Sequence, residues 1–146
     1  MALKLLYPAT RYDPSPVIDD LSRKEERDRL SASAVKAFLN IMDHWGVRDE
    51  DARQLLVLTN GPFYEMKKKA ETRRLDQDRL TRVSYLVGIF KALNLLHGKE
   101  LADKWIRLPN TNRIFAGQTP LEYMIRGGLP AMQTVRRLLD ARRGGV

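Results

Sequence analysis

The chain has 146 residues, 43% of them apolar, so it is long enough for one compact core and too short for two full-sized domains. Its 26 Lys and Arg against 18 Asp and Glu give a formal charge of +8, which favours a polyanionic partner such as nucleic acid, or else an acidic protein. Without cysteine, a disulfide framework, a zinc finger and a thiol nucleophile are excluded. Pro8 interrupts the N-terminal segment before the apolar stretch of a signal peptide could form. No segment approaches the roughly 20 apolar residues that a membrane helix needs. We therefore expect a soluble, cytoplasmic protein with no membrane segment.

Residues 1–30 are predicted to form a partly extended N-terminal arm. They hold six basic residues, six acidic residues and three of the seven prolines, so they contribute no net charge and offer few side chains for burial. We expect one helical turn at most in this segment. The whole charge of +8 therefore lies beyond Leu30.

From Ser33 onward, apolar residues recur at helical spacing and predict three helices in succession. The first ends at Gly46, and Asp49 is expected to cap a short second helix that closes at the polar break 59–61. Pro62 suits the first turn of a third helix because its φ is fixed and it has no N–H donor. The side of this helix that is expected to face inward carries Phe63, Met66 and Ala70.

A longer helix is predicted from Asp76 to His97, with Gly98 as its C-terminal cap. Its apolar stripe is broad, so we expect it to be buried against several neighbours and to join the front half of the molecule to the back half. A shorter helix that contains Trp105 follows it. The Pro, Asn, Thr and Gly content of residues 107–118 then predicts a loop.

The sharpest local signal is a capping box at Thr119, Pro120 and Glu122. The threonine hydroxyl accepts from the third amide of the helix, the glutamate reaches back, and proline takes the first helical position. Gly127 and Gly128 should stop this helix, and Pro130 should begin the last one. No alternating strand pattern of useful length occurs, so the predicted fold class is all-α.

Residues 49–70 have the organisation of a helix-turn-helix, in which a second helix with a basic outer side enters the major groove. An ordinary helical hairpin with a solvated lysine side has the same pattern. In many such motifs a glycine follows the first helix directly, whereas here Leu56, Val57 and Leu58 occupy that stretch. Arg79 and Arg82 extend the basic character. The residues expected to contact DNA are Asn60, Tyr64, Lys67, Lys68, Lys69, Arg73 and Arg74.

Arginine is concentrated again near the C-terminus, at Arg126, Arg136, Arg137, Arg142 and Arg143, with Asp140 as the one acidic residue among them. Such a cluster suits an acidic or phosphate-binding cleft of a partner, although a frayed, solubilising end has the same composition. We therefore interpret the charge of +8 as divided chiefly between the helix-turn-helix neighbourhood and this arginine-rich end.

The motifs of the common enzyme classes are absent from the sequence. There is no phosphate-binding glycine loop, no nucleophile elbow and no metalloprotease spacing of histidine and glutamate. His44 and His97 each stand without a neighbouring metal ligand. We expect no catalysis, no metal and no cofactor.

The order of motifs in the back half resembles the Xre, MbcA and ParS antitoxin family. The residues that carry the resemblance are Trp105, the Pro109 and Asn110 pair, the Gly117 to Leu121 helix start, and the Leu138 to Gly145 ending. The resemblance implies an Xre-like helix-turn-helix domain over residues 31–79 and a toxin-binding domain over residues 80–146. It also implies a dimer, an operator DNA and a cognate RES-domain toxin that consumes NAD.

Three hypotheses follow. In the first, the last two helices and the arginine-rich end plug the NAD pocket of the toxin. The residues then expected to bind the toxin are Glu122, Arg126, Arg136, Arg137, Arg142, Arg143, Gly144, Gly145 and Val146. In the second, the protein is a sequence-specific repressor that reads its own operator through residues 60–69. In the third, it is a helical adaptor with no DNA role.

Overall fold

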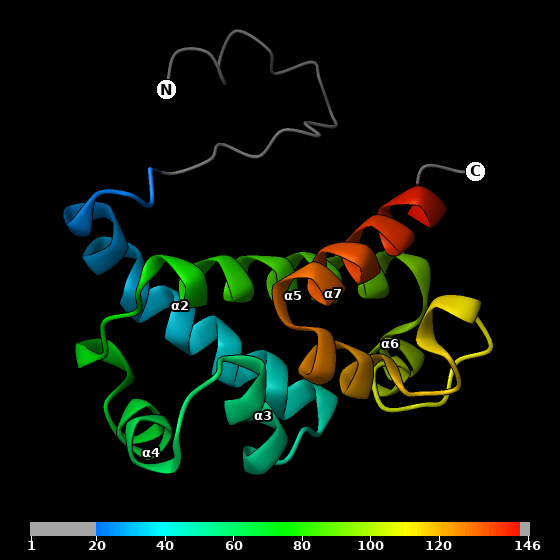
Figure 1. The fold of residues 1–146 in the computed structure, drawn as a ribbon, viewed down its shortest axis with the longest axis horizontal. Coiled ribbons are helices and arrows are strands. Elements are labelled where there is room, and N and C mark those ends of the chain that lie inside the picture. Colours follow the sequence, from blue (N-terminus) through cyan, green and yellow to red (C-terminus); the bar gives the residue numbers. More distant parts are fainter. Residues whose placement is uncertain (1–19, 144–146) are drawn as a thin grey trace, which may run out of the picture.

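The computed structural model describes residues 20–143. These residues form six α-helices and two 3₁₀ turns, with no strand among them, so the predicted all-α class is confirmed (Figure 1). Most of the predicted arm, together with Gly144, Gly145 and Val146, lies outside the described residues. Within residues 20–143, no helix is long and apolar enough to cross a membrane.

The first described helix, α2 (Lys24–Trp45), begins well before Ser33, so the prediction that residues 1–30 hold one helical turn at most is wrong for 24–30. This charged stretch is helical because its charges pair along the helix: Lys24 Nζ lies 2.7 Å from Asp28 Oδ2, and Glu26 pairs with an arginine three residues on. Acidic residues in the first turn also favour the helix dipole. As predicted, α2 ends at Gly46, whose φ of 65° is left-handed.

Two short helices, α3 (Asp49–Leu55) and α4 (Asn60–Lys68), and a 3₁₀ turn, η1 (Ala70–Thr72), complete the front half. Asp49 is the first residue of α3 and makes no capping hydrogen bond, so the prediction that it caps this helix is wrong. Pro62 is the third residue of α4, which starts at Asn60. Phe63 and Met66 are buried as predicted.

The central helix α5 (Gln77–Leu96) joins the two halves as predicted. Asp76 caps it by accepting the Arg79 backbone N–H at 2.9 Å. It packs against α2 on one side and against α7 (Pro120–Arg143) on the other. The α7 contact is close at Gly88, where a Cβ would lie 1.6 Å from Nη1 of Arg136. The helix ends at Leu96, and Gly98 instead precedes α6 (Lys99–Trp105), so the predicted glycine cap is wrong.

The predicted capping box forms at the start of α7. The Thr119 N–H donates to Glu122 Oε1 at 2.9 Å, and the Glu122 N–H donates to Thr119 Oγ1 at 3.1 Å. Between α6 and α7 lies a second 3₁₀ turn, η2 (Arg113–Phe115), whose Phe115 ring is buried. Gly128 has a φ of 64° and a ψ of −146°, so the predicted stop and restart of this helix are a kink within α7.

The two halves share one hydrophobic core and are joined by polar contacts. The Arg107 side chain, just after α6, donates through Nε to the Trp45 carbonyl oxygen at 2.6 Å, and so binds the C-terminal end of α2. Beside it, His44 Nδ1 lies 3.6 Å from Asp103 Oδ2. These contacts fix the orientation of the front half relative to the back half.

Ser31 fixes the chain that follows η1. It is completely buried, its hydroxyl donates to the Arg27 carbonyl oxygen at 2.6 Å, and it accepts the Leu75 backbone N–H at 2.9 Å. Without this hydroxyl, the buried Leu75 amide would have no partner.

We predict that Ser31→Ala lowers the free energy of unfolding by about 1–3 kcal/mol, the usual cost of an unsatisfied buried amide. Urea titration followed by circular dichroism measures it. Ser33→Ala is the matched control, because the exposed Ser33 hydroxyl bonds only a local carbonyl; it should change stability by less than about 0.5 kcal/mol. Equal stability of the two variants would contradict the role of Ser31.

Candidate DNA-binding and protein-binding surfaces

The connection between α3 and α4 is a tight reversal at Val57. This residue has a φ of 53°, a left-handed conformation that favours glycine and is an outlier for a β-branched side chain. Its side chain points to solvent, with 57% of its surface exposed. The turn typical of a helix-turn-helix is therefore present although glycine is absent, and the departure in the sequence is one of residue type and not of geometry.

Three arginines bind the carbonyl groups of this turn. Arg82 Nη1 donates to Leu55 O at 3.1 Å, and Arg79 donates to Leu56 O at 2.9 Å and to Val57 O at 2.7 Å. Arg53 Nη1 donates to Leu58 O at 3.1 Å. Each guanidinium also pairs with a carboxylate, from Asp78, Asp76 and Glu50 in turn. The side chains of Arg79 and Arg82 therefore bind the backbone of the turn, although the sequence suggested that they extend a basic surface.

The outward side of α4 carries Gly61, Tyr64 and Lys68, and 66% of the Tyr64 side chain is exposed. Asn60 is exposed at the start of the helix. The Lys67 side chain is directed toward α3, where its Nζ lies 2.9 and 3.0 Å from the two carboxylate oxygens of Asp49. Among the seven residues expected to contact DNA, Lys67 is thus the one that forms an ion pair between α3 and α4.

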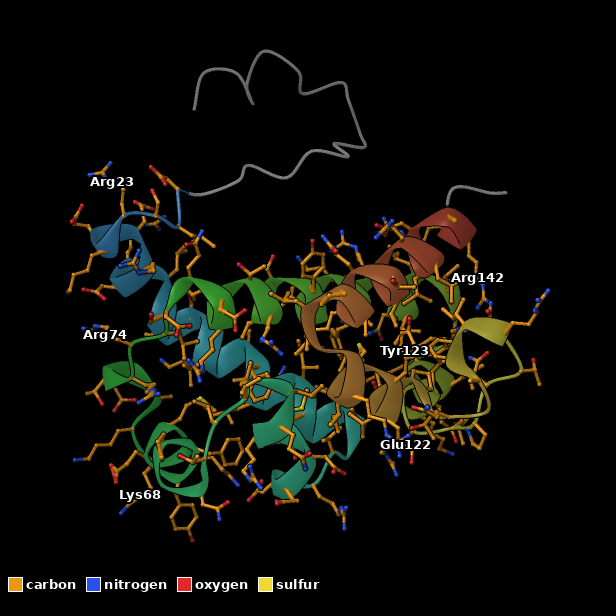
Figure 2. The ribbon with its side chains drawn as sticks, in the orientation of Figure 1. Arg23, Lys68, Arg74, Glu122, Tyr123 and Arg142 are labelled. Atoms are coloured by element: carbon orange, nitrogen blue, oxygen red, sulfur yellow. The ribbon has the colours of Figure 1, made fainter. Side chains whose placement is uncertain are left out.

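Lys68 and Lys69 are exposed and make no ion pair within the described chain. Arg74 follows on the same edge of the molecule, as Figure 2 shows, and its Nε lies 3.8 Å from Asp28 Oδ1. The hydrogen bond from Lys24, with the nearby Arg74 charge, lowers the pKa of Asp28. Arg73 is half-buried, and its Nε has no hydrogen-bond partner among residues 20–143. The cations open to solvent on this edge are chiefly Lys68, Lys69 and Arg74.

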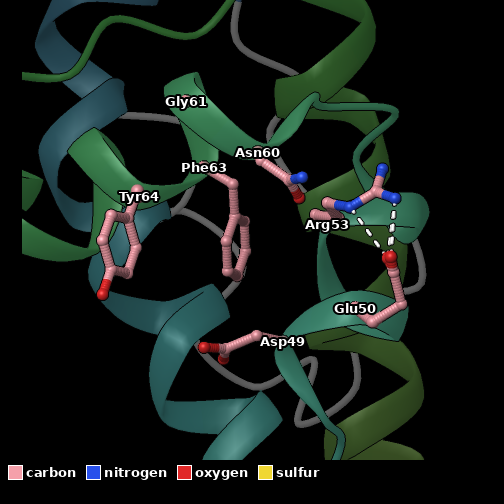
Figure 3. Close-up of a pocket in the computed structure, with 7 residues that line it drawn as sticks. All are labelled: Asp49, Glu50, Arg53, Asn60, Gly61, Phe63 and Tyr64. Carbon is pink, nitrogen blue, oxygen red and sulfur yellow. Dashed lines mark hydrogen bonds and ion pairs between the residues drawn. The ribbon is translucent and has the colours of Figure 1, made fainter.

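An open pocket of about 470 Å³ lies between α3 and α4 (Figure 3). Phe63 forms an apolar wall, and the pocket is also lined by Asp49, Glu50, Arg53, Asn60, Gly61 and Tyr64. Glu50 is bound to Arg53, and Asp49 to Lys67. No group of three metal-ligating side chains occurs in the described part of the chain.

The charge is distributed differently from the interpretation above. Residues 49–69 hold four basic and four acidic residues and so have no net charge, whereas residues 80–146 hold eleven basic and four acidic ones. The excess positive charge therefore belongs chiefly to the back half, and the helix-turn-helix neighbourhood contributes little of it.

The arginines of α7 have unequal surroundings. Arg136 lies across α5 at Gly88 and pairs with Asp140 at 2.9 Å, and Arg143 lies 3.6 Å from the same carboxylate. Arg137 and Arg142 are exposed and have no ion-pair partner among the described residues.

Glu122 and Arg126 lie near the start of α7, one helical turn apart. Glu122 is exposed but engaged in the capping box, and the Thr119 N–H, more than the nearby Arg126, lowers its pKa. Arg126 is exposed. Figure 2 places Lys68 and Arg142 at opposite ends of the molecule, so the exposed side of α4 and the exposed side of α7 are separate surfaces.

The fold and these two surfaces define a helix-turn-helix protein with an attached helical binding domain. Residues 24–88 match the antitoxin Xre-like helix-turn-helix domain, and residues 91–145 match the antitoxin Xre/MbcA/ParS C-terminal toxin-binding domain. The chain is also 37% identical over 113 residues to the uncharacterized protein y4oB of Sinorhizobium fredii (strain NBRC 101917 / NGR234). That match covers 76% of this chain and 84% of the relative. No solved structure matches. The chain belongs to the Xre/MbcA/ParS antitoxin family.

Because Val57 holds a left-handed conformation, we predict that Val57→Gly raises the free energy of unfolding by about 1 kcal/mol. Val57→Ala keeps a Cβ in the same conformation and should raise it less. Urea titration of both variants measures the order. A loss of stability in Val57→Gly would show that this turn is not strained.

Proposed function

We propose that the protein is the antitoxin of a type II toxin–antitoxin pair. It binds an NAD-consuming RES-type toxin and covers its active site, and as a dimer it represses its own operon in the cytoplasm. The observation that carries the first part is the match of residues 91–145 to a toxin-binding domain. Its last helix presents two exposed arginines, Arg137 and Arg142, that have no ion-pair partner among residues 20–143.

The exposed side of α7 supplies the toxin contact in this proposal. A cleft that holds the pyrophosphate of NAD needs cationic groups, so Arg137 and Arg142 pair with acidic groups at its rim and not with its floor. Arg136 and Arg143 share Asp140 and support the helix. Glu122 is exposed, but its Oε1 accepts the Thr119 N–H of the capping box. Its Oε2 is then the atom that binds a cationic group of the toxin.

The test co-expresses the full chain with the toxin encoded beside it and measures growth and co-purification. Reversing an interfacial charge costs about 2 kcal/mol or more. Arg137→Glu with Arg142→Glu should therefore weaken toxin binding by more than about tenfold and abolish protection.

Lys36→Glu is the control, because it reverses the charge of an exposed lysine of the front half that neither proposed contact uses. This control should protect like the wild type. Full protection by the α7 variant would place the contact elsewhere. If the wild type neither protects nor co-purifies with the toxin, the antitoxin function is wrong and the adaptor hypothesis takes its place.

DNA binding is the second part of the proposal, supported by the match of residues 24–88 and by the exposed cations at the end of α4. Lys68 and Lys69 are the phosphate contacts in this account, with Arg74 beside them. Lys67 makes a weaker contact because Asp49 holds its ammonium group.

We predict that Lys68→Gln with Lys69→Gln reduces the salt dependence of binding to the duplex upstream of the gene. Two lost phosphate contacts should lower the slope of log K against log salt by about 1.8. Lys67→Gln is the control and should change the slope less. Fluorescence anisotropy at several salt concentrations measures all three, and a double variant with the wild-type slope would contradict these contacts.

A further inference from the structure

The exposed large apolar side chains of residues 80–143 all lie between the end of α5 and the start of α7. They are Leu95, Leu101, Leu108 and Ile114. Within α7 itself there is none, and the exposed residues of its second half are Pro130, Gln133, Arg137, Ala141 and Arg142. The side of α7 that is proposed to meet the toxin therefore offers charge and no large apolar side chain, although the centre of a protein–protein interface is usually apolar.

Leu101 and Leu108 lie on one side of α6 and of the turn that continues it. The helical path extends beyond Trp105, because the Leu108 N–H donates to the Trp105 carbonyl oxygen at 3.3 Å. Seven residues are close to two helical turns, so the two leucines point in the same direction. Ala102 and Ile106 are completely buried on the other side, whereas 46% of Leu101 and 45% of Leu108 are exposed. We call the exposed surface of Leu101 and Leu108 the α6 edge.

The surroundings of the α6 edge are basic. Residues 95–118 hold four basic and two acidic residues. Lys104 Nζ lies 3.3 Å from Glu100 Oε1, whereas Lys99 and Arg113 are exposed and have no ion-pair partner among the described residues. A symmetric contact with a second copy of the chain would place this positive charge against itself, which is unfavourable. The α6 edge therefore fits an apolar surface with acidic groups around it on a different protein.

The α6 edge is attached firmly to the start of α7. The Leu121 N–H donates to the Ile106 carbonyl oxygen at 2.9 Å. The Phe115 ring lies edge-on to both Trp105 and Tyr123, with centroids 6.0 and 5.2 Å apart. Figure 1 places α6, η2 and the end of α7 at the same end of the molecule. These elements therefore present two surfaces in a fixed arrangement, one apolar and one charged.

We propose that Leu101 and Leu108 form an apolar contact for the toxin, in addition to the contact made by the arginines of α7. The two contacts have different kinetic roles. Apolar surface that is buried in the complex slows dissociation, whereas Arg137 and Arg142 attract acidic groups and speed the encounter. This inference rests on the proposed antitoxin function and adds a second contact surface and the step of binding that it controls.

The experiment measures association and dissociation rates of the full chain on the immobilised toxin that is encoded beside it. Leu101→Gln with Leu108→Gln should dissociate at least about tenfold faster and associate at nearly the wild-type rate. Arg137→Glu with Arg142→Glu should mainly slow association and change its salt dependence. The double glutamine variant should melt at the wild-type temperature, because both leucines are half-exposed and glutamine favours a helix about as well as leucine.

Val57→Gln with Tyr64→Gln is the matched control, because it removes the two exposed large apolar side chains of the front half. It should bind the toxin at wild-type rates. Wild-type dissociation of the Leu101 and Leu108 variant, or an equal loss in the control, would show that the inference is wrong while toxin binding stands.

Light scattering of the free chain tests the alternative occupant, a second copy. The Leu101 and Leu108 variant should have the same mass in solution as the wild type. A lower mass would show that the α6 edge joins two copies, and the inference would be wrong. If the wild type does not bind the toxin at all, the proposed antitoxin function fails and this inference fails with it.

Discussion

The helix-turn-helix of this protein depends on the contact between arginine side chains and the carbonyl groups of one strained turn. Leu55 to Leu58 present carbonyl oxygens that no helix satisfies, and Arg53, Arg79 and Arg82 bind all of them. These bonds are part-buried or, at the Val57 carbonyl, exposed, and they help to offset the unfavourable φ of Val57. Two of the arginines come from α5, and the orientation of α4 is therefore set by the helix that also carries the back half.

The same contact explains why a count of basic residues misplaces the DNA-binding charge. Arg53, Arg79 and Arg82 are each neutralised by a carboxylate and directed at the backbone, so they add nothing to the outer surface. The net charge is zero over residues 49–69, and the exposed cations that have no ion-pair partner among the described residues of this range lie at the end of α4.

The sequence predicts the parts of the fold that local chemistry determines. The end of α2 at Gly46 and the capping box at Thr119 each depend on residues within one helical turn. The left-handed Val57 could not be predicted, because the side chains that hold it lie more than twenty residues further along the chain.

Two predicted site residues also have contacts that the sequence could not predict. The bond between Lys67 and Asp49 joins two helices, and the position of Arg136 depends on a glycine in α5. In both cases a charged residue that looks like a surface contact in the sequence has a partner inside the molecule, which periodicity and composition do not reveal.

The packing of α7 constrains how the protein can meet a partner. Leu139 is fully buried, and Arg136 lies over Gly88, so the helix remains attached to α5 as far as its last turn. Freeing it as a loose peptide would expose this apolar side and leave the Arg136 site on α5 empty. In the proposed function, the toxin therefore meets α7 as a rigid helical surface with Arg137 and Arg142 outward. The kink at Gly128, beside Arg82, sets the direction of that surface relative to the turn between α3 and α4.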